Sequence, residues 1–362
     1  MSAQTRLITH IKESALAVAD SLGRMPVMME VCGTHTVSLS RTGLRDLLSD
    51  YIDLRSGPGC PVCVTDYPDV DHMIAFAEQE GVAVATFGDM VRVPGSRCSL
   101  EVARAKGASI KVVYSPLQAV EYAEANPGMQ VVFLGIGFET TAPTVAMSLF
   151  EAQKRKLSNF SVYSVHKLVP PVLKGLLGSE DISVDGFLLP GHVSTVLGRA
   201  ELDFVASEYG IPGVIAGFEV DDLVVAIDQL AMLIKKRTSR VVNAYQRVVR
   251  EEGNPRPKAA VERCFTPADA SWRGLGVIPK SGLALREEFA ALDAARRFTL
   301  NVPRSRPPRG CRCAHVLRGH IRPTSCPLFA KQCTPSSPVG PCMVSSEGAC
   351  AAYYNYDYAG HV

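Results

Sequence analysis

Short apolar runs alternate with longer segments of helical periodicity along most of the chain. The apolar runs have the length of buried strands, and the segments between them carry apolar residues at the spacing of an amphipathic helix. Strands are predicted at 27–31, 82–87, 110–114, 131–135, 161–165, 186–189 and 213–216. Helices are predicted at 4–22, 37–48, 67–79, 116–124, 141–154, 169–177 and 221–236. This alternation predicts an α/β protein, in which parallel sheets are covered by helices on both faces.

The later part of the chain departs from this alternation. Residues 241–252 continue a helical pattern, whereas residues 251–267 are polar and broken by prolines, which indicates a boundary between lobes. Residues 274–298 are expected to hold one more short strand and a helix. A chain of 362 residues is too long for one ordinary core. We predict two Rossmann-like parallel α/β lobes around a cleft and a third lobe, at 25–114, at 115–237, and at 1–24 with 238–362.

Several predicted strands end in a turn that combines glycine with a polar residue. Glu139 follows Gly137 in one such turn, and His192 follows Gly191 in another. Ligands of open α/β sheets gather at the carboxyl ends of the strands, so function is expected at these turns. For Glu139 two interpretations stay open: a carboxylate stabilised by the dipole of the following helix, or a proton donor or ligand that faces the same cleft as Cys32. Neither the glycine pattern of dinucleotide-binding folds nor that of P-loop proteins is present.

The charge and composition exclude two classes of partner. The net charge is +2 and the basic residues are scattered, so no nucleic-acid partner is expected. No apolar run reaches the roughly 18 residues of a membrane span, and the charged residues of 4–22 argue against a signal peptide. We therefore expect a cytoplasmic protein, in which eleven cysteines indicate metal binding or redox chemistry. Two of these, Cys98 and Cys264, lack partners nearby in the sequence and are interpreted as structural.

Six of the eleven cysteines lie close together near the end of the chain, at Cys311, Cys313, Cys326, Cys333, Cys342 and Cys350. Free structural thiols, a zinc site and an iron–sulfur cluster are the three interpretations. Structural zinc sites usually take their ligands from CxxC knuckles, which this segment lacks. Four thiolates on separate turns suit a [4Fe–4S] cluster. Two cysteines are then left over, which indicates a disulfide that the cluster can reduce.

Two motifs in the N-terminal part also carry thiols. Cys60 and Cys63 have the CxxC spacing of a dithiol–disulfide pair, and half of a zinc knuckle is the alternative. Cys32 lies at a predicted strand-to-helix turn, where the helix dipole and free amides should lower the pKa of its thiol. His35 follows one turn later. This thiol and imidazole could hold a transition metal or act as a nucleophile, and the alternative is a buried small residue at a tight turn.

Five motifs are distributed from the N-terminal part to the cysteine-rich segment. They are Cys-Gly-Thr-His at 32–35, Gly-Pro-Gly-Cys-Pro-Val-Cys at 57–63, Gly-Phe-Glu-Thr-Thr-Ala-Pro at 137–143, Leu-Pro-Gly-His-Val at 189–193 and the run at 338–350. Together they resemble the HypD family of hydrogenase maturation factors over essentially the whole chain. The resemblance implies a scaffold that assembles the Fe(CN)2CO unit of [NiFe]-hydrogenases with the small chaperone HypC and receives cyanide from HypE. It also implies that the iron, as Fe(II) with cyanide and carbon monoxide ligands, is held transiently between Cys32 and the N-terminal cysteine of HypC.

The resemblance further implies different roles for the six C-terminal cysteines. The cluster region of this family is similar to that of ferredoxin–thioredoxin reductase, where the first Cys of a CxC binds iron and the second belongs to a disulfide. Carried over by position, this gives Cys313 and Cys342 as the redox pair, and as cluster ligands Cys311, Cys326, Cys333 and Cys350. Spacing alone would equally allow the ligand set Cys326, Cys333, Cys342 and Cys350. One departure from the family is Ala314, where glycine is expected.

These expectations define one function and one alternative. The first is an iron–sulfur scaffold whose site residues converge in the cleft, namely Cys32, His35, Cys60, Cys63 and Glu139. Electrons would pass from the cluster through its neighbouring disulfide to the CxxC pair. The alternative is an iron–sulfur-dependent thiol–disulfide oxidoreductase that acts on protein substrates. Cys32 separates the two, because a simple reductase would not need a third active thiol beside a histidine.

Overall fold

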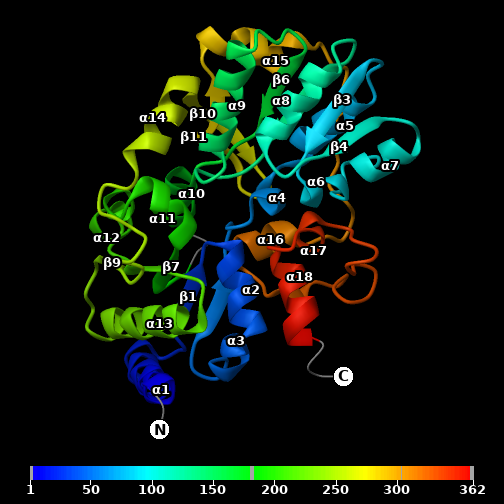
Figure 1. Ribbon diagram of the computed structural model, residues 1–362. Coiled ribbons are helices and arrows are strands. Elements are labelled where there is room, and N and C mark those ends of the chain that lie inside the picture. Colours follow the sequence, from blue (N-terminus) through cyan, green and yellow to red (C-terminus); the bar gives the residue numbers. More distant parts are fainter. Residues whose placement is uncertain (1–2, 180–182, 303, 359–362) are drawn as a thin grey trace.

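Two parallel sheets occupy opposite ends of the computed structural model, which describes residues 3–179, 183–302 and 304–358 (Figure 1). One sheet has five strands in the order β2-β1-β7-β8-β9, and the other has four in the order β4-β3-β5-β6. The strands are β1 (Val27–Glu30), β2 (Asp53–Ser56), β3 (Val82–Thr86), β4 (Ser109–Val112), β5 (Gln130–Gly135), β6 (Phe160–Ser164), β7 (Gly186–Pro190), β8 (Gly213–Ala216) and β9 (Val241–Asn243). Every pairing within these sheets is parallel, which confirms the predicted α/β class.

Most of the helices follow a strand in the chain, as the periodicity predicts. They are α1 (Ala3–Leu22), α2 (Gly33–Arg41), α3 (Leu44–Leu47), α4 (Pro61–Val64), α5 (Tyr67–Ala77), α6 (Gly88–Val91), α7 (Leu100–Ala105), α8 (Pro116–Ala125), α9 (Ala142–Lys154), α10 (Val169–Leu177), α11 (Gly191–Leu197), the 3-10 turn η1 (Ala200–Leu202), α12 (Phe204–Ser207) and α13 (Val220–Lys235). Every residue of β3 is buried, as expected of a strand with both faces covered. None of the described helices is long and apolar enough to cross a membrane.

The predicted division at residue 114 does not match the strand pairing. β1 pairs with β2 on one side and with β7 on the other, so the strands of 27–56 and 186–243 share the five-stranded sheet. The strands of 82–164 form the four-stranded sheet. One lobe is therefore inserted into the other. Parallel strands are joined by long crossovers, so neighbours in the sequence need not become neighbours in a sheet.

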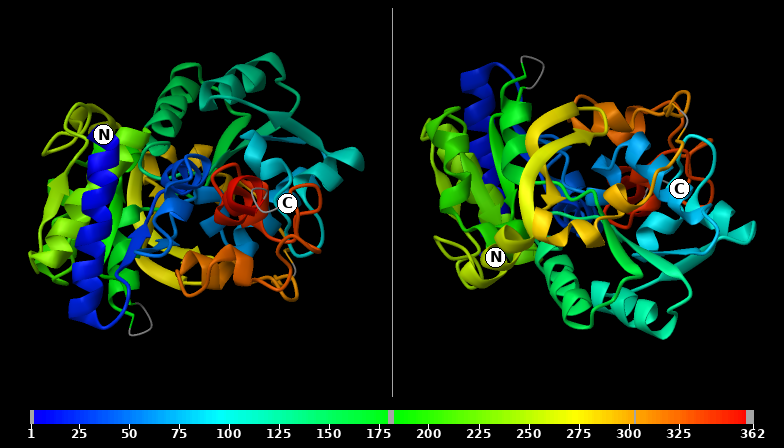
Figure 2. Two further views of the ribbon diagram at one scale, coloured as in Figure 1. Left: turned by 90° about the horizontal axis from the view of Figure 1, so that it is seen from below. Right: turned by 90° about the horizontal axis from the view of Figure 1, so that it is seen from above.

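Helix α1 does not belong to a third lobe with the C-terminal segment either. Its residues Ile11 and Ala15 are fully buried in the same core as Leu223 and Ile227 of α13. The two helices lie against each other on the outer side of the five-stranded sheet (Figures 1 and 2). The N-terminal helix thus completes a covering layer of that sheet.

The segment after α13 differs most from prediction. Residues 241–252 contain β9 instead of a helix, and residues 251–267, predicted as a lobe boundary, contain α14 and the start of β10. The elements are α14 (Pro255–Cys264), β10 (Phe265–Trp272), β11 (Gly276–Leu285), the 3-10 turn η2 (Glu287–Leu292) and α15 (Ala294–Arg297). The prolines of this segment were interpreted as breaks in regular structure, which was wrong. Pro255 starts α14, where a missing N–H costs no hydrogen bond, and Pro267 lies in a two-stranded ribbon with free edges.

The antiparallel ribbon of β10 and β11 links the two ends of the molecule. Phe265, at its start, is buried in the core of the four-stranded sheet. Trp272, at the end of β10, forms a β-bridge with Thr65, directly after α4. The ribbon therefore joins the four-stranded sheet to the CxxC helix.

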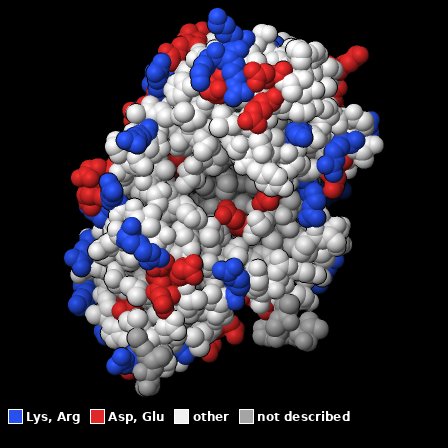
Figure 3. All heavy atoms as spheres, viewed as in Figure 1, with Lys and Arg blue, Asp and Glu red and all other residues white. Residues whose placement is uncertain are grey.

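The cysteine-rich segment consists of short turns packed beside α2 and α4 (Figure 1). Its elements are α16 (Cys313–Leu317), η3 (Pro323–Ser325), α17 (Pro341–Val344), α18 (Ala349–Ala352) and the π-helical turn η4 (Tyr353–Tyr358). The face in Figure 3 is hollowed between the two lobes, and acidic side chains are visible inside the hollow.

Candidate functional site

Cys32 lies at the turn between β1 and α2, as predicted. It is the N-cap residue of α2, and only 7% of its surface is exposed. The N–H of Gly33 donates a hydrogen bond to the carbonyl oxygen of Gly59 at 2.9 Å. The turn after β1 is therefore bonded directly to the loop after β2.

That loop approaches Cys32 at a distance that only glycine allows. A Cβ atom on Gly59 would lie 2.2 Å from the backbone nitrogen of Cys32 and 2.4 Å from its Cα. Cys60, the next residue, is the N-cap of α4 and forms a disulfide bond with Cys63. The two thiol motifs, whose first cysteines Cys32 and Cys60 are 28 positions apart in the sequence, thus meet backbone to backbone.

The pKa of Cys32 is raised, whereas the sequence predicted a lowered value. Burial raises the pKa of the Cys32 thiol to about 12, and the carboxylate of Glu347 adds to the rise. Hydrogen bonds from His35 and Thr34 at the helix N-terminus act in the other direction but do not outweigh burial. The free thiol is therefore protonated at neutral pH.

Glu347 is a neighbour of this turn that the sequence alone did not single out. Its Oε1 accepts a hydrogen bond from the Thr34 hydroxyl at 2.7 Å. A Cβ atom on Gly33 would lie 2.6 Å from the Cβ of Glu347, so the cysteine-rich segment packs tightly on the turn. The residue lies within the motif at 338–350, but nothing in its spacing predicts a contact with Thr34.

His35 is turned away from this junction, toward the end of β8. Its Nε2 lies 3.2 Å from the carbonyl oxygen of Ala216, and its ring lies 4.9 Å from that of Phe218. Burial lowers the pKa of His35 to about 4, so the imidazole is neutral. Nε2 then donates to Ala216, and Nδ1 keeps a lone pair without a partner among the described residues. Phe218 also stacks on His192 at 3.8 Å.

Glu139 faces another part of the molecule. Its Oε1 accepts a hydrogen bond from the N–H of Val169 at 2.8 Å, whereas Oε2 has no partner among the described residues. It lines a cavity of about 270 Å³ with residues of α14 and the β10–β11 ribbon. No hydrogen bond or ion pair within the described ranges joins it to Cys32 or the CxxC pair. Burial raises the pKa of Glu139 to about 7.

The six C-terminal cysteines gather in one place, on separate turns. Five of them line a small cavity of about 10 Å³, namely Cys311, Cys313, Cys326, Cys333 and Cys350. The sixth, Cys342, is fully buried beside them. Interactions with Cys313 and Cys350 lower the pKa of the Cys342 thiol. Interactions with Cys313 and Cys342, together with burial, raise the pKa of Cys350.

The chemistry of this cavity fits an iron–sulfur cluster better than a single hard cation. Its other walls are apolar, formed by Val316, Leu328, Phe329 and Met343. Thiolates are the ligands of iron–sulfur clusters, whereas hard cations take oxygen ligands. Among the described residues, no group of three or more His, Cys, Asp or Glu side chains is placed to hold one metal ion.

Polar contacts join the cysteine-rich segment to both lobes. Glu347 contacts the Cys32 turn of the five-stranded sheet, as described above. The hydroxyl of Ser345 donates to Oδ2 of Asp89 at 3.1 Å, in helix α6, which follows β3 of the four-stranded sheet. The segment therefore contacts residues that follow the carboxyl ends of strands from both sheets.

A family model described as "HypD: Hydrogenase formation hypA family" matches residues 3–357. The chain belongs to the HypD family. Relatives from several bacteria carry names that refer to hydrogenase maturation, expression or formation. The assignment confirms the resemblance drawn from the five motifs.

Three relatives illustrate how much of the chain is shared. Hydrogenase maturation factor HypD2 of Bradyrhizobium diazoefficiens is 45% identical, covering 95% of this chain and 94% of its own length. Hydrogenase maturation factor HypD of Rhodobacter capsulatus is 44% identical, with coverages of 94% and 92%. Hydrogenase maturation factor HypD of Escherichia coli K12 is 42% identical, with coverages of 97% and 94%. The chain is thus a hydrogenase maturation factor of the HypD family.

The close approach at Gly59 predicts a strong effect of one added methyl group. Gly59→Ala should lower the free energy of unfolding by about 3 kcal/mol or more, because the new Cβ meets backbone atoms that cannot rotate away. Gly128→Ala is the matched control, since no atom lies within 4 Å of the added Cβ. Urea unfolding of both variants measures the difference. A Gly59→Ala protein as stable as wild type would contradict the described junction.

Burial of Glu139 predicts a pH dependence of stability. The folded-state pKa of about 7 lies above the unfolded value near 4.5, so this group makes stability fall as pH rises from 4.5 to 7. Glu139→Gln should remove that fall and stabilise the protein at pH 8 by about 2 to 3 kcal/mol. Urea unfolding at pH 5 and pH 8 tests this. Glu262→Gln, at the exposed rim of the same cavity, should change neither value, and equal behaviour of the two variants would refute the assignment.

Proposed function

We propose that this chain is the scaffold on which an iron ion receives two cyanide ligands and one carbon monoxide ligand during maturation of a [NiFe]-hydrogenase. It would work with a HypC-type small chaperone and a HypE-type cyanide donor. Family membership supports the pathway, and one observation carries the role of this chain. That observation is the junction at Gly59, where the Cys32 turn and the CxxC loop touch under the cysteine-rich segment.

In this proposal the Cys32 sulfur holds the iron as cargo. A thiolate is a suitable anchor for Fe(II) with strong-field cyanide and carbon monoxide ligands. Because burial keeps the free Cys32 protonated, iron binding must displace the thiol proton. Burial also raises the pKa of Glu347, so its carboxylate accepts a proton more readily than an exposed one. Glu347, hydrogen-bonded to Thr34 beside Cys32, is the acceptor we propose.

The cysteine-rich segment is proposed to hold a [4Fe–4S] cluster, with Cys311, Cys326, Cys333 and Cys350 as its ligands. All four line the small apolar cavity, whereas Cys342 does not, which favours this set over the one that includes Cys342. When bound, such a cluster would supply electrons one at a time. Cys313 and Cys342 remain as the redox pair; the Cys342 thiol interacts with Cys313, as it also does with Cys350.

The numbers of electrons and protons exchanged by the two cysteine pairs are equal. Oxidation of the Cys313 and Cys342 thiols to a disulfide releases two electrons and two protons. Reduction of the Cys60–Cys63 disulfide to two thiols consumes the same number. Helices α16 and α17 of the cysteine-rich segment pack against α4, so the exchange is proposed to run between these elements.

The alternative, a reductase of protein disulfides, has less support. Cys60 is 4% exposed and Cys63 is fully buried. Thiol–disulfide exchange needs direct attack of one sulfur on another, so a protein substrate could not reach this pair without opening the fold. The buried Cys60–Cys63 disulfide beside Cys32 is better suited to accept electrons from within the protein than from a protein substrate.

Infrared spectra test the proposal, because cyanide and carbon monoxide stretches report the cargo. The protein purified anaerobically with its small partner chaperone should show these bands. Cys32→Ala should abolish the bands and leave the visible absorption of the cluster unchanged. Cys98→Ala, a partly exposed thiol outside the site, is the control and should keep both. Wild-type protein that contains iron and sulfide but lacks the bands would refute the scaffold and favour the reductase.

A further inference from the structure

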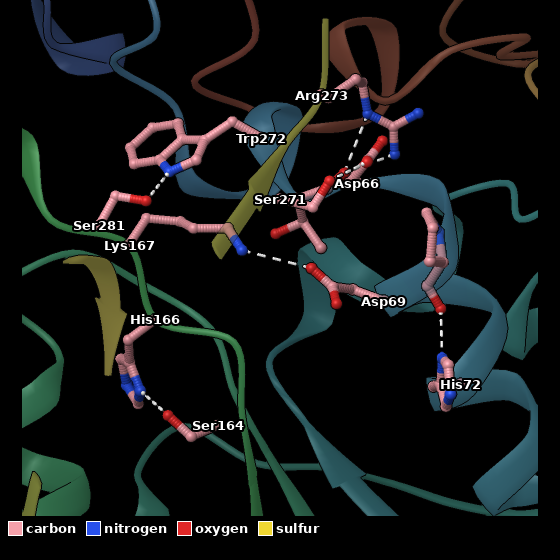
Figure 4. A network of polar contacts seen from close by, with 12 residues as sticks. Asp66, Asp69, His72, Ser164, His166, Lys167, Ser271, Trp272, Arg273 and Ser281 are labelled. Atoms are coloured by element: carbon pink, nitrogen blue, oxygen red, sulfur yellow. Dashed lines mark hydrogen bonds and ion pairs between the residues drawn. The ribbon is translucent and has the colours of Figure 1, made fainter. Parts of the chain in front are cut away.

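Arg273 is a fully buried arginine between the two redox elements. It follows β10 directly and is 1% exposed. Its backbone N–H donates to the carbonyl oxygen of Val64 at 2.9 Å. Its Nε and Nη2 both donate to the carbonyl oxygen of Thr65, at 2.9 and 2.6 Å. The residue therefore clasps the end of the CxxC helix α4 through backbone and side chain together (Figure 4).

Among the described residues, no carboxylate forms an ion pair with the guanidinium of Arg273. The guanidinium lies over the ring of Tyr67, with Cζ 3.7 Å from the ring centre, and Nη1 has no hydrogen-bond partner among the described residues. None of the ion pairs in the described ranges includes Arg273. Asp66, drawn beside it in Figure 4, already accepts hydrogen bonds from the Tyr67 N–H and the Ser271 hydroxyl.

An unpaired buried charge is strongly destabilising, and arginine cannot discharge by losing its proton. The missing anion must therefore be sought among the neighbours of the guanidinium. The adjacent Gly274 packs against the cysteine-rich segment, where a Cβ on it would lie 2.6 Å from the Cα of Ala314. Ala314 follows Cys313 directly, so the sulfur atoms of this segment are, besides Asp66, nearby groups that can carry negative charge.

Helix packing supports this placement. Helices α16, which begins at Cys313, and α17, which contains Cys342, both pack against α4. Arg273 holds the end of that same helix through its hydrogen bonds to Thr65. Cysteines on two different turns of the segment are therefore neighbours of the helix to which the guanidinium is bonded.

We propose that Arg273 is the counter-ion of the six-cysteine centre and raises its reduction potential by stabilising its reduced, more negative state. The inference rests on the proposed function for the role of that centre in electron transfer. Its sign does not depend on which four sulfurs bind a cluster, because reduction adds negative charge to a cluster, and also to a disulfide wherever one of the two sulfurs formed is a thiolate. Arg273 is a positioning residue in this account, since it acts through the sulfurs.

Two substitutions separate the effect of the Arg273 charge from the effect of its hydrogen bonds to the end of α4. Arg273→Gln keeps a hydrogen-bond donor for the Thr65 carbonyl but removes the charge. Arg273→Lys keeps the charge but loses the paired hydrogen bonds of Nε and Nη2 to that carbonyl. The potential of the cluster is measured by anaerobic optical redox titration of the full chain. Arg273→Gln should reduce the equilibrium constant for reduction at least tenfold, about 59 mV for a one-electron couple. Arg273→Lys should stay within about threefold of wild type while its melting temperature falls.

Arg297→Gln is the matched control. Arg297 is also partly buried and bonded to backbone carbonyls, at Phe160 and Ser158, but it lies at the four-stranded sheet. Its loss removes one positive charge and should leave the potential unchanged. An unchanged potential in Arg273→Gln would overturn the proposal. Equal shifts in the Gln and Lys variants would also overturn it, since they would indicate a purely structural role.

The experiment distinguishes failure of this inference from failure of the proposed function. Wild-type protein without iron and sulfide would refute the cluster. The same variants are then compared as iron-free full chains in dithiothreitol redox buffers at pH 8, with thiols counted by alkylation. Arg273→Gln should again be harder to reduce by at least tenfold, about 30 mV for a two-electron couple. No difference from wild type in that assay would overturn the role of Arg273 on its own.

Discussion

The candidate site depends on the contact between the backbones of Gly59 and Cys32. The parallel pairing of β1 with β2 makes both following loops leave the same edge of the sheet, and the absence of a side chain at Gly59 lets them touch. The hydrogen bond from Gly33 to Gly59 fixes this contact. Every later feature builds on it, because the cysteine-rich segment packs on the Cys32 turn through Glu347 and on the CxxC helix through α16 and α17.

Burial then decides the charge state of the groups around this contact. Cys32, His35 and Glu139 all have pKa values moved toward their neutral forms, each mainly by burial. Cys32 can therefore become an anion only when a cation replaces its proton, which is the behaviour expected of a thiol that receives iron. Arg273 is different, because it stays charged in the same interior. A fixed cation beside six thiols gives this part of the protein a built-in preference for the reduced state of its sulfurs.

Three features could be predicted from the sequence: the α/β class, the strand-to-helix turn at Cys32 and the family. They depend on periodicity and on local motifs, which involve only residues close together in the chain. The sequence did not allow the lobes to be predicted, since β1, which ends at Glu30, pairs with β7, which begins at Gly186, and the chain between them contains the other sheet. Glu347 was missed for the same reason, because its partner Thr34 lies 313 positions away. The lowered pKa predicted for Cys32 was wrong because the helix N-terminus was visible in the sequence and burial was not.

The central claim is that iron occupies two separate places, a cluster among the C-terminal cysteines and a cargo ion at Cys32. Anomalous X-ray diffraction at the iron absorption edge, from crystals of the anaerobically purified protein with its small partner chaperone, tests this most directly. The account predicts one strong peak enclosed by Cys311, Cys326, Cys333 and Cys350, and a separate weaker peak at Cys32. Iron bound by Cys60 and Cys63, or no peak at the six-cysteine cavity, would contradict it.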